Sequence, residues 1–270
     1  MSERDIIKAS CAVLQTGDAV LKADYARCVA AGWQRGDISC SATNVTYPPD
    51  RPSRPDRPEL QSPGKMPRRR LGSVHGRQAL LHAIAHIELN AIDLAFDMIA
   101  RFSGDLPDQQ RSDFISDWIS VGDDEARHFM MIQERLVQLD SHYGALPAHD
   151  GLWEAAEATS DDILARLSVA PLVLEARGLD VTPGMIRNLT SVGDLESATL
   201  LQTIYDEEVG HVAIGAKWLK TLARQQGQDP ATCFRHYVSS RFKGTLKEPF
   251  NHDARQLAGL ERHFYTNIIH

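Results

Sequence analysis

The sequence has few of the features that mark a secreted, membrane-spanning or nucleic-acid-binding protein. Its four cysteines form no CxxC pair, so neither a zinc knuckle nor a redox disulfide is indicated. No stretch approaches the roughly 18 apolar residues of a transmembrane helix, and the N-terminus lacks the apolar core of a signal peptide. A net charge of −7 does not favour broad binding to nucleic acid or membranes. We therefore expect a soluble cytoplasmic protein.

Prolines and hydrophobic periodicity divide the 270 residues into four parts. Residues 47–67 hold seven of the thirteen prolines, which excludes a regular helix or an internal strand there. From Gln78 onward, apolar residues recur at three- and four-residue steps, as in an amphipathic helix. The predicted parts are a helical segment (1–45), a proline-rich basic arm or linker (46–77), a helical bundle (78–226) and a helical extension (227–270).

The bundle is expected to contain four long helices and no strand, which makes the fold all-α. The first begins near Gln78, and the second covers about 108–140, between Pro107 and Gly144. The third covers about 160–177, kinks at Pro171 and stops at Gly178. Thr182 and Pro183 then open a short helix, and the fourth long helix runs over about 194–226. Shorter helices are expected near 230–241 and 253–267, and one helical segment at the N-terminus ends near Gly32.

Two Glu-x-x-His motifs lie on faces that are otherwise apolar. The second helix carries Glu125 and His128, and the fourth carries Glu208 and His211. Residues three apart project from the same side of a helix, so each pair faces the interior together. Burying carboxylates and imidazoles without partners costs several kcal/mol, roughly, for each group. Metal coordination removes that cost.

A single glutamate on each of the other two helices completes the set. Glu88 lies on the apolar face of the first helix, and Glu175 follows Leu172 on the third. Glu88 precedes Glu125 by 37 residues and Glu175 precedes Glu208 by 33, as two similar helical hairpins require. One Glu from each of two helices and Glu-x-x-His from each of the other two form the ligand set of carboxylate-bridged dinuclear sites in four-helix bundles.

The alternatives are ordinary surface charges or a buried salt-bridge network. The six residues include no Lys or Arg to neutralise four glutamates, which favours metal. Carboxylates and imidazoles suit two iron ions, with manganese or a mixed manganese–iron pair as alternatives. We expect the ions to lie about 3.5–4 Å apart. Glu125 and Glu208 would bridge them, Glu88 and Glu175 would be terminal, and open positions would admit dioxygen.

Four neighbouring residues are candidates to support these ligands. Asp124 and Glu207 each precede a ligand glutamate and could reach the histidine of the opposite hairpin, or could be exposed acids. Arg127 could pair with such a carboxylate, and Tyr205 could line the cavity or belong to the core. His86 points away from the Glu88 face, so we interpret it as a packing or surface histidine.

The six ligands in this order resemble the ferritin-like superfamily of di-iron proteins. The sequence is most similar to a bacterial family in it, named domain of unknown function 455, across most of residues 45–240. The similarity lies at HAIAHIELNAIDLAFD (82–97), DEARHF (124–129), LEARGLDVTPGM (174–185), DEEVGHVAIG (206–215), PRRRLGS (67–73) and PAHDGLW (147–153). The resemblance implies a ferritin-like bundle with a dinuclear site at the six residues, and no established substrate.

DEARH is also similar, more distantly, to the motif of bacterial multicomponent di-iron hydroxylases, and di-iron tRNA hydroxylases are another relative. In those hydroxylases an acidic residue and an arginine support the histidine. The second motif here has Gly210 where the arginine would stand, so a symmetric arginine role is not implied at that half.

The favoured hypothesis is an oxygenase or oxidase in which the iron pair activates dioxygen to attack a small-molecule substrate. The alternatives are a tRNA-modifying hydroxylase, a ferroxidase or iron store, a rubrerythrin-like peroxide reductase and a scaffold with a structural metal. No flavin, haem or iron–sulfur motif is visible, so electrons would come from a separate donor or from the substrate. The oligomeric state stays open, because the N-terminal helices could cap the bundle or pair two chains in a dimer.

The proline-rich arm carries a local excess of positive charge. Its basic residues outnumber its acids seven to two between residues 51 and 70 (Arg51, Arg54, Arg57, Lys65, Arg68, Arg69 and Arg70 against Asp56 and Glu59). This patch could hold tRNA phosphate, a carboxylated metabolite or a carrier protein. It could equally pack its arginines on the acidic bundle, and the scarcity of aromatics weakens an argument from base stacking.

Overall fold

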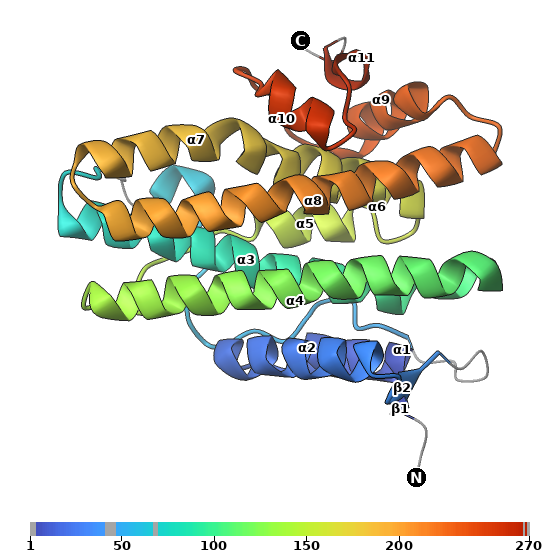
Figure 1. The fold of residues 1–270 in the computed structure, drawn as a ribbon, viewed down its shortest axis with the longest axis horizontal. Coiled ribbons are helices and arrows are strands. Elements are labelled where there is room, and N and C mark those ends of the chain that lie inside the picture. The colour runs from blue at the N-terminus through green and yellow to red at the C-terminus, as the bar shows by residue number, and fades with distance from the viewer. Residues whose placement is uncertain (1–3, 41–46, 67–69, 267, 269–270) are drawn as a thin grey trace. The chain divides into compact units, whose positions relative to one another are not determined.

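The computed structural model describes residues 4–40, 47–66, 70–266 and 268. The chain forms two compact units, residues 1–153 and residues 154–270. Helices dominate both, and the only strands in the described ranges are two residues long, so the predicted all-α class is confirmed. The boundary between the units falls inside the stretch 78–226, so each unit holds one of the two helical hairpins (Figure 1).

The N-terminal segment consists of two helices, where the sequence predicted one. Helix α1 covers Ile6–Gln15 and α2 covers Ala19–Gln34. The break arises because Asp18 adopts an extended backbone and its side chain accepts the Leu21 N–H at 2.9 Å, which starts a new helix. Two parallel strands, β1 (Arg4–Asp5) and β2 (Ile38–Ser39), tie the ends of this segment together.

A long helical hairpin forms the core of the first unit. Helix α3 covers Val74–Phe102, and α4 covers Asp108–Gln138 after a turn of 3₁₀ helix, η2 (Ser103–Asp105). Helix α3 begins four residues before the predicted Gln78, because the Ser73 hydroxyl accepts the Gly76 N–H at 3.1 Å and caps the helix. Helix α1 packs on α3, and α2 packs on α4.

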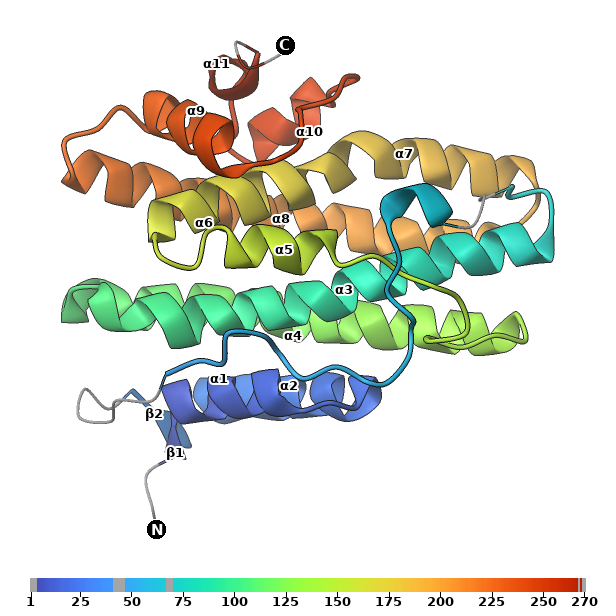
Figure 2. The same cartoon turned by 180° about the vertical axis from the view of Figure 1, so that it is seen from behind.

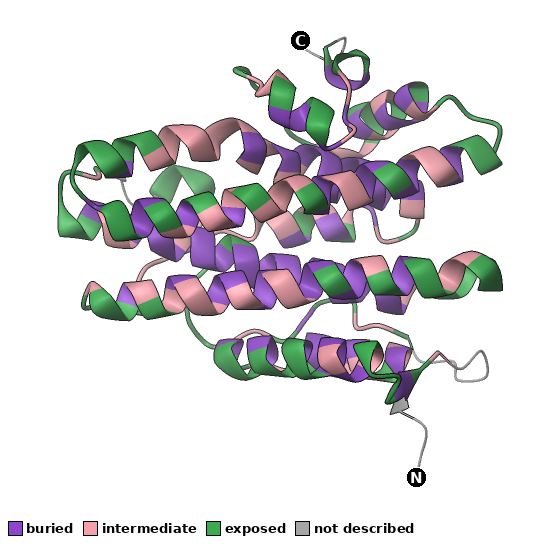
Figure 3. Cartoon of the chain, viewed as in Figure 1, coloured by how far each residue is buried: buried purple, intermediate pink, exposed green. Residues whose placement is uncertain are grey.

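Helix α3 is long and apolar enough to cross a membrane, although no such stretch was predicted from the sequence. The stretch Val74–Asp105 has a mean hydropathy of 1.3 over 18 residues, and 89% of that window is buried inside the protein. Figure 3 shows this burial along most of the helix. The helix therefore resembles the core helix of a soluble protein.

The proline-rich arm lies against the helices of the first unit (Figure 2). As predicted for residues 47–67, its described residues up to Met66 contain no α-helix and only a short 3₁₀ turn, η1 (Pro63–Lys65), and a bridge between Leu60 and Ala148. The last four residues of the predicted arm, 74–77, belong instead to α3. The Ser53 N–H donates to the Leu14 carbonyl at 2.8 Å, and the Arg101 guanidinium donates to the Pro49 carbonyl at 3.1 Å. The described part of the arm is therefore bound to the helices over residues 49–54.

Two of the arm's arginines form ion pairs with acids of the first unit. Arg54 contacts Asp93 at 3.1 Å, and the buried Lys22 contacts the same carboxylate at 2.5 Å. Arg51 pairs with Asp150. These contacts match the expectation that the arm packs its arginines on acids of the helical bundle, although one of these acids, Asp93, is fully buried. Two further basic residues of the predicted patch, Arg68 and Arg69, lie outside the described residues.

The second unit contains the other hairpin. After α5 (Gly151–Glu157), which spans the boundary, come α6 (Ile163–Val169), a π-helical segment η3 (Ala170–Glu175) and α7 (Ala176–Ser191). Helix α8 (Leu195–Gln225) packs on α7 and η3. The C-terminal extension forms α9 (Pro230–Arg241), as predicted, and two short helices, α10 (His252–Leu257) and α11 (Arg262–Tyr265), in place of the single predicted helix.

The prediction for the third helix was wrong in two respects. Pro171 does not kink an α-helix but lies in the π-helical segment, and the helix continues past Gly178 to Ser191. Pro183 lies inside α7 and opens no new helix. A proline removes the donor that would serve the carbonyl four residues before it, here that of Leu179. The Asn251 side-chain amide donates to the Leu179 carbonyl at 3.2 Å, so a residue 72 positions away satisfies the backbone at this point.

A glycine on α8 allows the π-helical segment to approach. A Cβ added to Gly215 would lie 2.5 Å from Cβ of Pro171. We expect Gly215→Ala to lower the free energy of unfolding by about 1–3 kcal/mol, because the ring and the helix backbone must separate. Gly210→Ala on the same helix is the matched control, since nothing lies within 4 Å of its added Cβ. Alanine there should be neutral or stabilising by up to about 1 kcal/mol. Urea denaturation measures both, and equal effects would contradict the packing described.

Candidate metal centre

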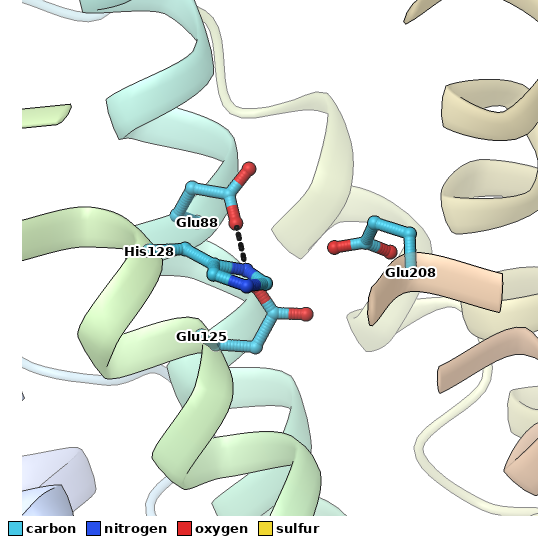
Figure 4. Close-up of side chains that lie close together, drawn as sticks. All are labelled: Glu88, Glu125, His128 and Glu208. Carbon is cyan, nitrogen blue, oxygen red and sulfur yellow. Dashed lines mark hydrogen bonds and ion pairs between the residues drawn. The ribbon is translucent and has the colours of Figure 1, made fainter. Parts of the chain in front are cut away.

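Three of the six predicted ligands gather in the first unit. Glu88 lies on α3, and Glu125 and His128 lie one turn apart on α4. Each offers a ligand atom, and these atoms lie within 4.8 Å of one another. His128 Nδ1 is 3.2 Å from a Glu88 oxygen and 3.7 Å from a Glu125 oxygen. Figure 4 shows both carboxylates turned toward the imidazole ring; Glu208, also drawn there, belongs to the second unit.

The hairpin explains why these three side chains meet. Gly122, one turn before Glu125, lets α3 and α4 approach closely, since a Cβ there would lie 2.7 Å from the Phe96 ring. Glu88, Glu125 and His128 are all buried, with exposed fractions of 4%, 1% and 0%. The side chains next to them along α4 are apolar core residues, such as Val121 and Phe129. The polar cluster is thus built into the apolar interior of the hairpin.

The electrostatics of this cluster follow from two buried carboxylates and one imidazole. Burial raises the pKa of Glu88 well above its usual value, and the negative charge of Glu125 raises it further. Burial alone would lower the pKa of His128, but hydrogen bonds and charge attraction from Glu125 and Glu88 outweigh it and raise the pKa to about 11. Protons therefore supply the positive charge that the two carboxylates need when no cation is bound. A divalent ion would supply that charge in their place.

The other three predicted ligands lie in the second unit. Glu208 and His211 share a face of α8, with His211 Nδ1 3.5 Å from a Glu208 oxygen. His211 is buried, and the Glu208 side chain is 14% exposed. Glu175 ends the π-helical segment η3, which packs against α8. π-Helical turns are frequent at functional sites, because the extra residue reorients the side chains around it.

The four candidate supporting residues have the following places. Arg127 pairs with Asp124 at 2.9 Å along α4, as the sequence suggested. The Tyr205 hydroxyl, one turn before Glu208, accepts a hydrogen bond from the Asn251 side-chain amide at 3.0 Å. Glu207 is half-buried on α8. The proposed reach of Asp124 and Glu207 to the opposite histidines stays a prediction.

His86 has a structural role, which confirms the packing interpretation. Its Nδ1 is 2.8 Å from the Tyr143 hydroxyl, and its Nε2 is 3.2 Å from the His149 carbonyl. One turn earlier, His82 Nε2 accepts the Gly144 N–H at 2.9 Å. The sequence showed the spacing of His82 and His86 but not these partners, because they come from the connection after α4 and only the fold brings them to α3.

Asn251 is a second residue that sequence reasoning missed. An asparagine before a short helix is a recognisable cap, and its side chain does accept the Ala254 N–H at 3.2 Å. Its contacts with Leu179 and Tyr205 had no signal in the sequence, since they depend on the packing of α10 against α7 and α8.

Comparison with known proteins agrees with the family named from the sequence. The sequence matches the family described as "Protein of unknown function (DUF455)" over residues 15–266. A protein of Haemophilus influenzae, described as uncharacterized, is 38% identical over 211 residues, which cover 77% of this chain and 73% of that protein. No solved structure matches the chain.

The two buried histidines of α3 contribute stability that is lost in acid. Burial lowers the pKa of His82 to about 4 and that of His86 to about 3, against about 6.5 when unfolded. The unfolded chain therefore binds protons that the folded chain does not, and stability present above pH 6.5 is lost as the pH falls toward 4. Each histidine should cost about 2 kcal/mol between pH 7.5 and pH 5.

Urea denaturation at the two pH values measures this loss. His82→Asn, which keeps an acceptor for the Gly144 N–H but does not titrate, should show a loss smaller by about 2 kcal/mol. His75→Asn on the same helix is the control, because His75 is exposed. An unchanged loss in His82→Asn would show that His82 titrates normally in the folded protein.

Proposed function

Because the chain belongs to the DUF455 family, whose description names no function, we propose an activity from its own residues: it is an oxidoreductase that holds two iron ions and uses them to activate dioxygen. The observation that supports this proposal most strongly is the buried cluster of Glu88, Glu125 and His128, in which two carboxylates lie beside one imidazole. We propose further that its helices form a ferritin-like four-helix bundle, in which the second hairpin supplies Glu175, Glu208 and His211.

The chemistry of the donors supports metal over the alternatives. Each unit offers two glutamates and one histidine, and the Glu-x-x-His pair comes from one helix in both cases. Hard oxygen donors with imidazole suit iron or manganese. In the first unit, burial and repulsion raise the pKa of Glu88, which marks a site with too little positive charge. An iron pair, when bound, supplies electrons to dioxygen and open positions for it to bind.

The protein's own residues have three tasks in this proposal. The glutamates balance the charge of the cations, and His128 loses the proton that it holds in the cation-free state, so binding releases protons. The hairpin keeps water out through the apolar residues around Glu125, among them Phe129 and Val121. Arg127 is held by Asp124 on the adjoining face of α4, where it can order the backbone that carries His128.

A small molecule is favoured over tRNA as the substrate. Arg51 and Arg54, two members of the arm's basic patch, are engaged in ion pairs with Asp150 and Asp93. Their positive charge is therefore partly neutralised within the first unit, and this reduces the positive charge of the arm that is available to bind phosphate groups. We place the reaction in the cytoplasm and assign its electrons to a separate donor or to the substrate.

Anaerobic Fe(II) loading followed by exposure to oxygen tests the proposal. We expect two iron ions per chain and oxidation of both on exposure to oxygen, followed by absorption and Mössbauer spectroscopy. Oxidation with continued uptake beyond two ions would identify an iron store instead. Fewer than two ions per chain, or two ions inert to oxygen, would contradict the proposed activity.

Variants of single glutamates locate the ions. Glu125→Gln and Glu208→Gln should each weaken iron binding by at least 100-fold, because a neutral amide replaces a charged carboxylate that would hold both ions. Glu134→Gln on α4 is the control, since Glu134 is exposed on the same helix as Glu125. Equal iron affinity in Glu125→Gln and Glu134→Gln, measured by equilibrium dialysis, would exclude Glu125 as a ligand.

A further inference from the structure

The C-terminal extension makes an unusual set of contacts with the hairpin of the second unit. Asn251 precedes α10 and reaches two helices at once: its side-chain amide donates to the Leu179 carbonyl of α7 at 3.2 Å and to the Tyr205 hydroxyl of α8 at 3.0 Å. Its own N–H donates to the Asp180 carboxylate at 2.8 Å. One side chain thus links α7, which follows Glu175, to α8, which carries Glu208.

The residues around Asn251 make this link rigid. Arg255 is buried and binds both oxygens of Asp180, at 2.8 and 2.7 Å. Its guanidinium also lies near the rings of Phe250 and Tyr265, 4.8 and 4.7 Å from their centroids. A two-pronged ion pair near two aromatic rings holds its geometry far better than an exposed salt bridge does.

The link contacts α7 where the backbone hydrogen bonding of this helix is interrupted. Pro183 deprives the Leu179 carbonyl of its helical donor, and the π-helical turn ends at Glu175, one turn earlier. Without Asn251, two irregularities would adjoin with an unsatisfied carbonyl between them. On α8, Tyr205 stands three residues before Glu208, so its hydroxyl fixes the turn that carries this glutamate.

We propose that Asn251, together with Tyr205, is a positioning residue for the metal centre: it sets the place of Glu175 relative to Glu208 and His211. The inference rests on the proposed function, since it concerns the ligands assigned there. It gives the C-terminal extension a part in the chemistry, although none of its residues is a ligand. An ion held by Glu175 and His211 should depend on this link more strongly than an ion held by Glu88 and His128, because Glu208 alone of the residues that the link places would be shared by both.

Two variants remove the hydrogen bonds of this link and keep the other structural roles of Asn251 and Tyr205. Asn251→Ser keeps a good cap for α10, but its side chain is too short to reach α7 and α8. Tyr205→Phe removes only the hydroxyl. Tyr237→Phe is the matched control, because its hydroxyl donates to Asp162 at 2.6 Å elsewhere in the same unit.

The experiment is anaerobic Fe(II) titration of the full chain by equilibrium dialysis, with Mössbauer spectra of the loaded protein. We expect Asn251→Ser and Tyr205→Phe each to weaken the binding of one ion by 10–100-fold and that of the other by less, and to change the two iron signals unequally, as loss of a ligand-orienting contact does. The double variant should bind iron no more weakly than Asn251→Ser alone, because in that variant the Tyr205 hydroxyl has already lost its hydrogen bond. Tyr237→Phe should bind as the wild type does.

The outcomes distinguish this inference from the proposal on which it depends. Wild-type binding of two ions with no change in Asn251→Ser and Tyr205→Phe would overturn the positioning role and leave the proposed function standing. Equal weakening of both ions, or additive effects of the two variants, would also overturn it, because general loosening of the fold has that result. A wild type that binds no iron would overturn the proposed function and the inference with it.

Discussion

Two buried carboxylates that need positive charge are the constraint on which this structure depends. Glu88 and Glu125 lie in the interior of the α3–α4 hairpin, next to His128. An ionised carboxylate buried without compensation costs far more than the few kcal/mol by which proteins are stable. Raised pKa values for Glu88 and His128 are the response of the cation-free protein. Such an arrangement has no structural advantage over apolar packing, so a bound cation is the simplest reason for it.

The rest of each unit serves to hold such side chains in place. In the first unit, the arm and the N-terminal helices cover α3 and α4, and the buried pair of Lys22 and Asp93 connects α2 to α3. In the second unit, the C-terminal extension performs the corresponding task through Arg255 and Asn251. The coverings differ completely in sequence, although each hairpin carries the same types of donor. The proposed function therefore requires two independent solutions to one packing problem.

The long helices were predictable because their signals are local. Apolar periodicity placed α4 and α8 within a few residues of their observed ends, and Pro107 and Gly144 helped to bound α4. The Glu-x-x-His pairs were predictable for the same reason, since a spacing of three residues decides which side chains share a helical face. The contacts of Glu88 with His128 needed only the assumption that neighbouring hairpin helices pack.

The errors arose where distant residues override a local signal. Pro183 ordinarily ends or opens a helix, but Asn251 supplies the missing hydrogen bond and α7 continues through it. Gly178 ordinarily stops a helix, yet it lies within α7, which continues to Ser191. Tyr143 and Asn251 could not be assigned partners, because their contacts join segments more than 40 residues apart. Local rules thus located the proposed ligands better than the residues that hold them.

Anomalous diffraction at the iron absorption edge, from crystals grown with Fe(II) under anaerobic conditions, tests the central claim most directly. The account predicts two peaks about 3.5–4 Å apart. One should lie beside Glu88 and His128, the other beside Glu175 and His211, with Glu125 and Glu208 between them. A single peak bound only by residues of one unit, or no peak at these residues in crystals that contain iron, would contradict the account.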